Sequence, residues 1–290
     1  MSDPGNAARL AALSWGLPEP QHLRTGMSSL WSVNDEMVLR VTTDDATSKR
    51  WPLLSTELLR QGIRVPRSLG EMSYAHDGWI VTRVEHIHSE GAVDWAEVGA
   101  MVRLVHALDP APLLRDMDLP WCGSFVHWQV DRLFAELSSS LDEAARAGME
   151  ARMRRWDGWS DMLTDSANVV CHGDLHPGNV LPTQTGPVLI DWDLMCIGPV
   201  AWDHAPLLLW EQRWTDRWGA GSGTYEEFAK GYGQSLREDD SACTLAEVRL
   251  LVATLMRMKA AQVHPEARPE LERRLRWWRG EPDAPRWEPQ

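Results

Sequence analysis

Long apolar runs are missing from this chain of 290 residues. No stretch approaches the roughly 20 apolar residues that a membrane-spanning helix needs, and no basic segment followed by an apolar one opens the sequence. We therefore expect a soluble, cytoplasmic protein. Because 43% of its residues are hydrophobic, the chain can still build a substantial core, in one large domain or two moderate ones.

Cysteine is also scarce. The four cysteines show neither the CxxC spacing of a zinc site nor the density of a disulfide-rich secreted domain. We interpret them as buried thiols and predict neither zinc nor disulfide bonds. They are Cys122, Cys171, Cys196 and Cys243.

Positive charge is in deficit, and the deficit lies in one part of the chain. Residues 1–83 hold nine basic and nine acidic residues, whereas residues 84–290 hold 20 basic and 33 acidic ones, so the second part carries the whole net charge of −13. A negative field repels nucleic acid and anionic lipid, and it attracts cations. The balance therefore argues against a nucleic-acid or membrane partner and fits a cationic small molecule, with solubility alone as the other explanation.

The most informative stretch is residues 171–194, with the sequence CHGDLHPGNVLPTQTGPVLIDWDL. An apolar strand is predicted at 169–171, followed by a polar loop that proline and glycine prevent from becoming a helix. The strand is expected to resume at 180–181, and a second strand at 188–190 follows a turn. We expect one hairpin-like pair of strands whose ends bring the polar residues together.

Three of those polar residues meet the needs of phosphoryl transfer. Transfer from ATP requires a carboxylate that orients the acceptor hydroxyl and oxygen ligands that hold magnesium against the phosphates. Asp174 would be the orienting base, and Asn179 and Asp191 would hold Mg²⁺. A solvated acidic surface hairpin is the alternative, but it leaves Asn179 and the apolar flanks unexplained.

These motifs resemble those of the aminoglycoside phosphotransferase family, which includes choline kinases and other small-molecule kinases with a protein-kinase-like fold. Residues 172–179 are similar to the family's HGDxxxxN loop, and residues 190–193 to its ID[WF][DE] segment. The resemblance implies an α+β fold with two lobes: a small antiparallel sheet with one helix, and a larger, mainly helical lobe. Residues 1–83 would form the nucleotide-binding lobe, and residues 84–290 the catalytic and substrate-binding lobe.

The resemblance also implies where ATP would bind. A phosphate-covering loop of the form GxS[NS] is matched at residues 26–29, and the next strand carries Arg40 where the family usually has lysine. Arginine has a wider, planar fork, so this departure bears on nucleotide affinity or orientation. Glu57 is expected to pair with Arg40, and backbone groups at the end of the last strand would bind the adenine edge. The expected nucleotide-binding residues are Gly26, Ser28, Ser29, Arg40, Glu57, Thr82 and Val84.

A further group is expected to form the acceptor site. Trp210, Trp214 and Trp218 recur every four residues, which predicts one shared helix face. Such a stripe is usually core, but with Glu211 beside it the stripe also suits an aromatic and acidic wall for a cation. Asp193 could assist either the metal or a substrate ammonium group. The candidate substrate-binding residues are Asp193, Trp210, Glu211 and Trp214.

Two other polar residues are expected to be structural. Asp203 lies in a segment similar to one that follows the metal-binding motif in the family, where it should cap a helix or brace the catalytic loop. His106 lies on an amphipathic helix predicted at 96–108, and we interpret it as a hydrogen-bonded packing residue.

Together these features predict an enzyme that uses ATP and Mg²⁺ to phosphorylate a hydroxyl group of a small cationic molecule. An aminoglycoside or a basic peptide antibiotic is the preferred acceptor, which would confer resistance. The alternatives are a metabolic kinase for choline, a homoserine-like compound or a sugar, and a nucleotide-binding regulator without transfer activity. A protein kinase is disfavoured because the short interval between Asp191 and Asp203 leaves no room for a long activation segment. A monomer or a dimer is expected.

Overall fold

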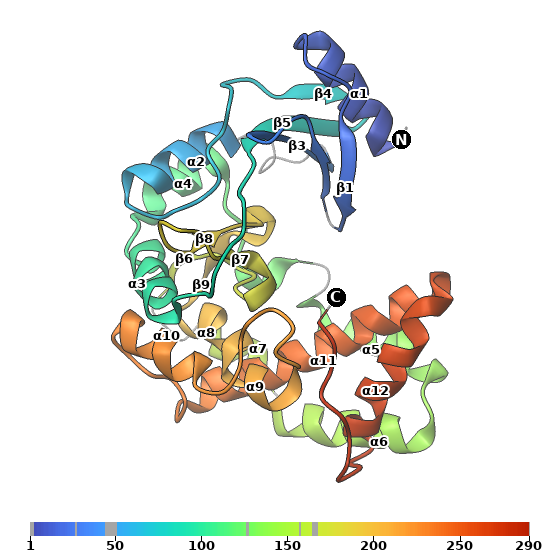
Figure 1. Ribbon diagram of the computed structural model, residues 1–290. Coiled ribbons are helices and arrows are strands. Elements are labelled where there is room, and N and C mark those ends of the chain that lie inside the picture. Colours follow the sequence, from blue (N-terminus) through green and yellow to red (C-terminus); the bar gives the residue numbers. More distant parts are fainter. Residues whose placement is uncertain are drawn as a thin grey trace. The chain divides into compact units, whose positions relative to one another are not determined.

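The chain folds into two units, each described here by itself (Figure 1). The computed structural model describes residues 3–26, 28–43, 51–125, 128–156, 158–163 and 168–289. The first unit comprises Met1–Asp94, Asp109–Leu119 and Val180–Asp193. The second comprises Trp95–Leu108, Pro120–Asn179 and Leu194–Gln290. The expected division after residue 83 differs from this grouping, because two later segments return to the first unit.

A five-stranded antiparallel sheet forms the framework of the first unit, with the strand order β1-β2-β3-β5-β4 (Figure 1). In the register between the central strands β3 and β5, Val41 lies opposite Val81 and Arg40 opposite Thr82. Leu39, Val41 and Val81 are fully buried, so the middle of the sheet supplies the core. The strands are β1 (Gln21–Thr25), β2 (Ser29–Ser32), β3 (Met37–Thr43), β4 (Tyr74–His76) and β5 (Trp79–Glu85).

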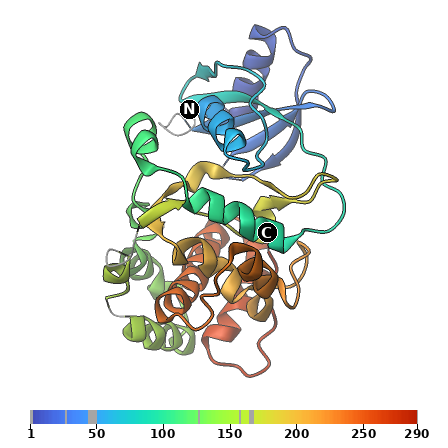
Figure 2. The ribbon, with the colours of Figure 1, turned by 90° about the vertical axis from the view of Figure 1, so that its left-hand side faces the viewer.

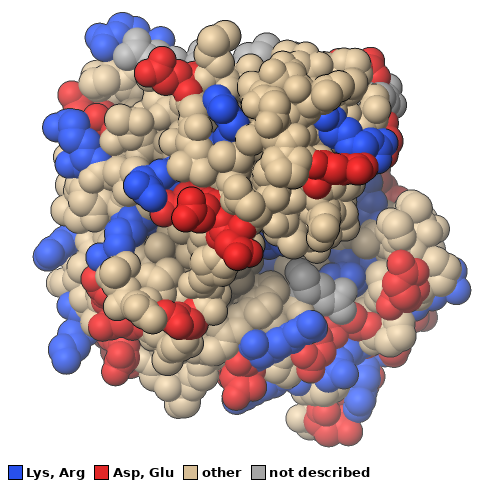
Figure 3. Space-filling view, turned by 45° about the horizontal axis from the view of Figure 1, so that its top comes forward, with Lys and Arg blue, Asp and Glu red and all other residues tan. Residues whose placement is uncertain are grey.

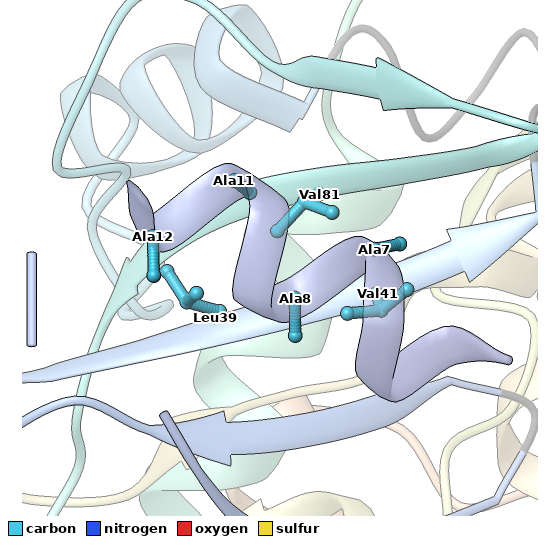
Figure 4. Close-up of a cluster of buried hydrophobic side chains, with 7 residues drawn as sticks. All are labelled: Ala7, Ala8, Ala11, Ala12, Leu39, Val41 and Val81. Carbon is cyan, nitrogen blue, oxygen red and sulfur yellow. The ribbon is translucent and has the colours of Figure 1, made fainter. Parts of the chain in front are cut away.

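Helix α1 (Pro4–Ser14) covers this core with alanine side chains. The alanines recur with helical spacing, so they share one face, and their small size lets the helix approach the sheet closely. Figure 4 shows them facing Leu39, Val41 and Val81 of the sheet. They are Ala7, Ala8, Ala11 and Ala12. Asp3 caps the helix by accepting a hydrogen bond from the Gly5 amide.

Two later segments complete the first unit. Strands β7 (Val180–Leu181) and β8 (Val188–Leu189) form the expected hairpin. The Leu189 amide donates to the carbonyl oxygen of Arg64 at 2.9 Å, which ties the hairpin to the chain after helix α2 (Trp51–Arg60). Helix α4 (Pro110–Met117) belongs to the same unit.

The second unit consists mainly of helices, as Figure 2 shows. Its longest helix, α11, has 24 residues and packs against α8, α12 and α5. Strand β6 (Asn168–Cys171) pairs with β9 (Cys196–Pro199). The helices used below are α3 (Trp95–His106), α5 (Val130–Leu137), α8 (Ala201–Leu208), α9 (Trp210–Arg213), α10 (Thr224–Tyr232), α11 (Asp240–Val263) and α12 (Arg268–Trp278).

The predicted α+β class is confirmed, with a small antiparallel sheet and a larger helical part. One detail of the sequence prediction is wrong. The strands on either side of the polar loop do not form a single strand, because β6 pairs with β9 while β7 pairs with β8. Within the described residues, no helix is both long and apolar enough to cross a membrane.

Two glycines allow α3 and α10 to pack closely. A Cβ atom at Gly99 of α3 would overlap the carbonyl oxygen of Phe228, and one at Gly231 of α10 would overlap that of Ala96. Each helix therefore presents a glycine to the backbone of the other.

Replacing Gly99 or Gly231 by alanine is expected to lower the free energy of unfolding by about 1–3 kcal/mol, because the added methyl group overpacks this contact. Helix propensity alone would change stability by about 1 kcal/mol in the opposite direction, so a net loss reports the clash. Urea unfolding measures the change. Gly221→Ala is the control, because a Cβ there meets nothing within 4 Å. Unchanged stability in both helix variants would contradict the close packing.

Candidate active site

The loop that carries Asp174 follows β6 in the second unit and is fixed by a buried carboxylate. The amides of His172 and Gly173 donate to the two oxygens of Asp203 at 2.7 and 2.9 Å. Gly173 has a φ of +89°, and a Cβ there would overlap the carbonyl oxygen of Leu194. Only glycine fits this position, so the direction in which the chain enters Asp174 is set by backbone geometry.

Asp203 is itself held by a buried hydrogen-bonded chain. His106 Nε2 lies 3.2 Å from Asp203 Oδ2, and the Tyr232 hydroxyl lies 2.9 Å from His106 Nδ1. Burial alone would raise the pKa of Asp203, but His106, His172 and the Gly173 amide outweigh it and hold the pKa below its usual range. The predictions that Asp203 braces the loop and that His106 is a packing residue are confirmed.

Asp174 lies among groups that favour its ionised form. Arg249 Nη1 is 3.6 Å from one carboxylate oxygen, and His176 Nε2 is 3.6 Å from the other. Burial alone would raise the pKa of Asp174, yet the charges of His176 and Arg249 hold it well below its usual range. Asn179 Nδ2 donates to the backbone oxygen of Asp174 at 2.9 Å. A carboxylate that is ionised at neutral pH can accept a hydrogen bond or a proton from a hydroxyl group.

Arg249 is the main residue in contact with this loop that sequence reasoning missed. It lies on α11, donates to the carbonyl oxygen of Gly173 at 2.8 Å, and places its guanidinium over the rings of Trp128 and Trp202 at 4.8 and 5.0 Å. The signal in the sequence is an arginine among apolar residues of a helical segment that also carries Glu247, Arg257 and Lys259. That pattern indicates a buried partner but does not identify it.

In the first unit, Arg40 forms an ion pair with the carboxylate of Asp193. The predicted pair of Arg40 with Glu57 is wrong. Glu57 accepts hydrogen bonds from Arg60 and Gln61 at 2.7–2.8 Å, and these bonds lower the pKa of Glu57 to about 2. The two donors lie three and four residues further along the chain, at the last residue of the helix and just beyond it, which places them within reach of Glu57.

The pair also changes the interpretation of Asp193. The sequence suggests that this carboxylate assists either the metal or a substrate ammonium group. Its partner in the structure is the guanidinium of Arg40, so its charge is already compensated within the first unit. Asp191, two residues earlier, has a φ of +65°. Such a backbone is unusual for a residue other than glycine and is often found at functional sites.

The small-residue turn at residues 26–29 connects β1 and β2, as predicted. Its backbone closes through the Gly26 amide, which donates to the carbonyl oxygen of Ser28 at 2.9 Å. Ser28 and Ser29 are buried, and Met27 lies outside the described residues. A role of this turn in phosphate binding stays a prediction.

Thr82 and Val84 are poorly placed to bind adenine through their backbone. On the edge of β5 that faces away from β3, the carbonyl oxygen of Arg83 accepts a hydrogen bond from the Leu69 amide. The Glu85 amide donates to the carbonyl oxygen of Arg67 on the same edge. Successive residues of a strand direct their backbone groups to opposite edges, so those of Thr82 and Val84 point to β3. These groups are therefore engaged in the sheet, which corrects the expected adenine contact.

A cavity of about 240 Å³ lies beside Asp174 in the second unit. Residues of α11 at helical spacing form one wall, and three tryptophans contribute to another. The lining residues are Asp174, His176, Ala205, Pro206, Leu209, Trp210, Trp214, Trp218, Ala246, Arg249, Leu250, Ala253, Arg257, Arg274 and Pro289. The cavity therefore has both an aromatic surface and direct access to the carboxylate of Asp174.

The three tryptophans meet without sharing a helix. Helix α9 ends at Arg213, because the backbone from that residue onward pairs with Trp287. The predicted helical stripe is therefore wrong, yet the rings converge. Those of Trp210 and Trp214 stack at 5.0 Å, and those of Trp210 and Trp218 at 5.9 Å.

Glu211 does not line the cavity within the described residues. Its carboxylate accepts a hydrogen bond from the Gly223 amide at 2.9 Å, at the start of α10, and pairs with Arg237 at 3.3 Å. A helix N-terminus and a guanidinium both favour a carboxylate, so these contacts hold Glu211 in a structural position. The predicted role in binding the substrate is not supported.

Comparisons with known proteins agree with the fold. A model of the phosphotransferase enzyme family matches residues 31–239. A spectinomycin phosphotransferase solved with ADP and spectinomycin is 16% identical, with a TM-score of 0.63 over 94% of each chain. A variant of aminoglycoside 2′-phosphotransferase-IIIa solved with GDP is 13% identical, with a TM-score of 0.69 over 93% of this chain and 96% of that one. An aminoglycoside phosphotransferase from Streptomyces rimosus is 18% identical, with a TM-score of 0.59 over 87% of this chain and 99% of that one. No curated protein matches the sequence.

Replacing Asp203 by asparagine is expected to lower the free energy of unfolding by about 3 kcal/mol, because a buried amide cannot accept all the hydrogen bonds that the carboxylate accepts. Chemical unfolding followed by tryptophan fluorescence measures the change. Asp131→Asn, at an exposed site on α5, should stay within about 1 kcal/mol of the parent. Equal stabilities of the two variants would contradict the bracing role.

The stability that Asp203 contributes should depend on pH, because its pKa in the folded protein lies below its ordinary value of 3.8. Such a group stabilises the folded state fully above the pKa of the unfolded chain, and the effect is lost as the pH falls through the lower folded pKa. Urea unfolding from about pH 7 to about pH 3 measures the free energy of unfolding of the parent and of Asp203→Asn. The difference between these two free energies should narrow below about pH 4. A difference that stays constant would show that Asp203 keeps its ordinary pKa.

Proposed function

Because the chain belongs to the phosphotransferase enzyme family, we propose that it transfers the γ-phosphoryl group of ATP to a hydroxyl group of a small molecule. The observation that carries the proposal is the ionised Asp174, held on a loop that Asp203 braces, beside a cavity. Catalysis of this reaction depends mainly on position and charge neutralisation, which such a site supplies.

Asp174 would orient the acceptor hydroxyl and accept its proton as the new bond to phosphorus forms. Its low pKa keeps it ionised at neutral pH, and Arg249 and His176 hold its two oxygens in place. Since a hydroxyl group loses its proton only as it attacks, a fixed acceptor at that point favours the transition state.

Asn179 and Asp191 would hold Mg²⁺, for which carboxylate and amide oxygens are suitable ligands. The amide nitrogen of Asn179 is engaged with the backbone of Asp174, which directs the nitrogen toward the loop and leaves the oxygen for a cation. The ion would neutralise charge on the transferred phosphate. The strained backbone of Asp191 is consistent with a functional position.

In the first unit, Arg40 would contact the phosphates of the nucleotide, and Asp193 would take the place expected for Glu57 as the carboxylate that holds the guanidinium. The turn at Gly26, Ser28 and Ser29 would cover the phosphates. Two of the similar solved structures are named as complexes with ADP or GDP, which supports a purine nucleotide as the donor.

We propose an antibiotic as the acceptor, so that the reaction would confer resistance. The similar solved structures are named as spectinomycin and aminoglycoside phosphotransferases, which supports this class. The net charge of −13 attracts cations to the protein as a whole and does not by itself identify the acceptor. On the face shown in Figure 3, basic and acidic side chains lie interspersed, so this face carries no single large acidic patch.

Phosphate transfer from ATP is tested with a panel of antibiotics, amino alcohols and neutral sugars, with product detected by mass spectrometry. Transfer to an antibiotic supports the proposal. Magnesium-dependent ATP binding without transfer to any acceptor would instead favour a regulator, and transfer only to an amino alcohol or a sugar would favour a metabolic kinase.

Asp174→Asn is expected to reduce kcat by at least about 100-fold, because the amide cannot accept the proton of the hydroxyl group. Circular dichroism and urea unfolding check that the variant still folds. Asp131→Asn serves again as the exposed control and should keep parental activity. Full activity of Asp174→Asn would remove Asp174 from the mechanism.

A further inference from the structure

The cavity beside Asp174 carries more positive than negative side chains. Three guanidinium groups line it, from Arg249, Arg257 and Arg274, whereas Asp174 is the only carboxylate among its lining residues in the described part of the chain. This local balance is opposite in sign to the net charge of the whole protein. The question is which of the three guanidinium groups can act on a ligand.

Two of the three arginines are already engaged by the protein. Arg274 pairs with Glu270 at 2.8 Å, and both side chains are buried. Arg249 donates to the carbonyl oxygen of Gly173 at 2.8 Å and lies beside Asp174. Both groups therefore serve the internal structure, and neither offers a free charge to a ligand.

Arg257 differs from both. Its Nε is buried, and among the described residues no acceptor forms a hydrogen bond with it. Partial burial lowers the pKa of Arg257, whereas the charge of Glu270, which is bonded to Arg274, raises it. Arg257 is only partly buried, and an anionic ligand in the cavity can form a charge-assisted hydrogen bond with its guanidinium.

The rest of the cavity favours a flat or apolar ring. The rings of Trp210 and Trp214 lie within 14° of parallel, and those of Trp210 and Trp218 within 23°. The His176 ring stacks on both Trp210 and Trp218. The ring surfaces that remain open to the cavity can bind planar or apolar groups and exclude water from the charges beside them.

Helix α11 fixes the distance between the two ends of the cavity. Arg249, beside Asp174, and Arg257 lie eight residues apart on it, which corresponds to about 12 Å along the helix axis. A ligand whose hydroxyl group reaches Asp174 and whose anionic group reaches Arg257 must therefore extend along this part of the helix, with the arginine side chain covering part of the distance.

From these observations we infer that the acceptor is a hydroxylated ring compound bearing a carboxylate, and that Arg257 selects it by binding the carboxylate. This inference rests on the proposed phosphotransferase function and specifies the acceptor of the same site. The hydroxyl group lies at Asp174, the ring lies against the tryptophans, and the carboxylate lies at Arg257. A polycation would bring its charges close to the guanidinium of Arg257, which disfavours its binding here.

Three probes of matched shape test the inference. They are 4′-(hydroxymethyl)biphenyl-4-carboxylate, the uncharged carboxamide and the cationic aminomethyl compound, which differ only in the charge at one end. Isothermal titration calorimetry measures their affinities without nucleotide, with kanamycin as the polycation. Mass spectrometry measures phosphorylation of the same compounds separately, with ATP and Mg²⁺.

The carboxylate is expected to bind at least about tenfold more tightly than the aminomethyl compound, the gain typical of a hydrogen bond between charged groups. Arg257→Met should remove most of that preference and leave the carboxamide affinity within about twofold. Arg257→Lys should retain part of the preference. Lys259→Met, which removes a charge from an exposed site on the same helix, should change nothing.

Four results would overturn the inference: tighter binding of the aminomethyl compound, tighter binding of kanamycin, no binding of the carboxylate, or an unchanged preference in Arg257→Met. The failure of the proposed function has a different signature. If the carboxylate preference depends on Arg257 but no compound is phosphorylated, the binding site stands and the enzymatic activity fails. If kanamycin is phosphorylated and the carboxylate preference is missing, the activity stands and the selection by Arg257 fails.

Discussion

The structure of the loop that carries Asp174 depends on one buried carboxylate. Asp203 accepts hydrogen bonds from two consecutive amides of the loop, and His106 contacts it from another helix. A carboxylate with no exposure to water is stable only when such donors surround it, so the loop and α8 must fold around each other. The positive φ of Gly173 is part of the same constraint, since a side chain there would collide with the neighbouring backbone.

Helix α11 extends that constraint from the loop to the cavity. Arg249 bonds to the carbonyl oxygen of Gly173, whose amide is bonded to Asp203, so the same peptide segment is held from two sides. The helix face that carries Arg249 also supplies Arg257 and much of the cavity wall. The position of the Asp174 carboxylate and the shape of the cavity therefore both depend on α11, together with the bracing by Asp203.

The sequence predicted contacts between residues that are close together in the chain, and it missed contacts between residues that are far apart in the chain. Asp174 and Asn179 lie five residues apart in a loop bounded by strands, and their proximity follows from that spacing. Arg249 could not be assigned, because its partner lies 76 residues away in sequence. The choice of Asp193 over Glu57 as the partner of Arg40 has the same origin. Helical neighbours satisfy Glu57 first, and only the folded chain brings Asp193, 153 residues away, to Arg40.

Net charge is a weak guide to the chemistry of a buried site. The field of exposed charges is screened beyond about 8–10 Å at physiological salt, whereas a buried guanidinium acts on its ligand at contact distance with little screening. The excess of acidic residues in the second part of the chain therefore bears on solubility and on encounters with cations. The proposed recognition of the acceptor instead depends on the few side chains that line the cavity, where Arg257 Nε has no hydrogen-bond partner among the described residues. An acidic protein can thus hold a site that selects an anion.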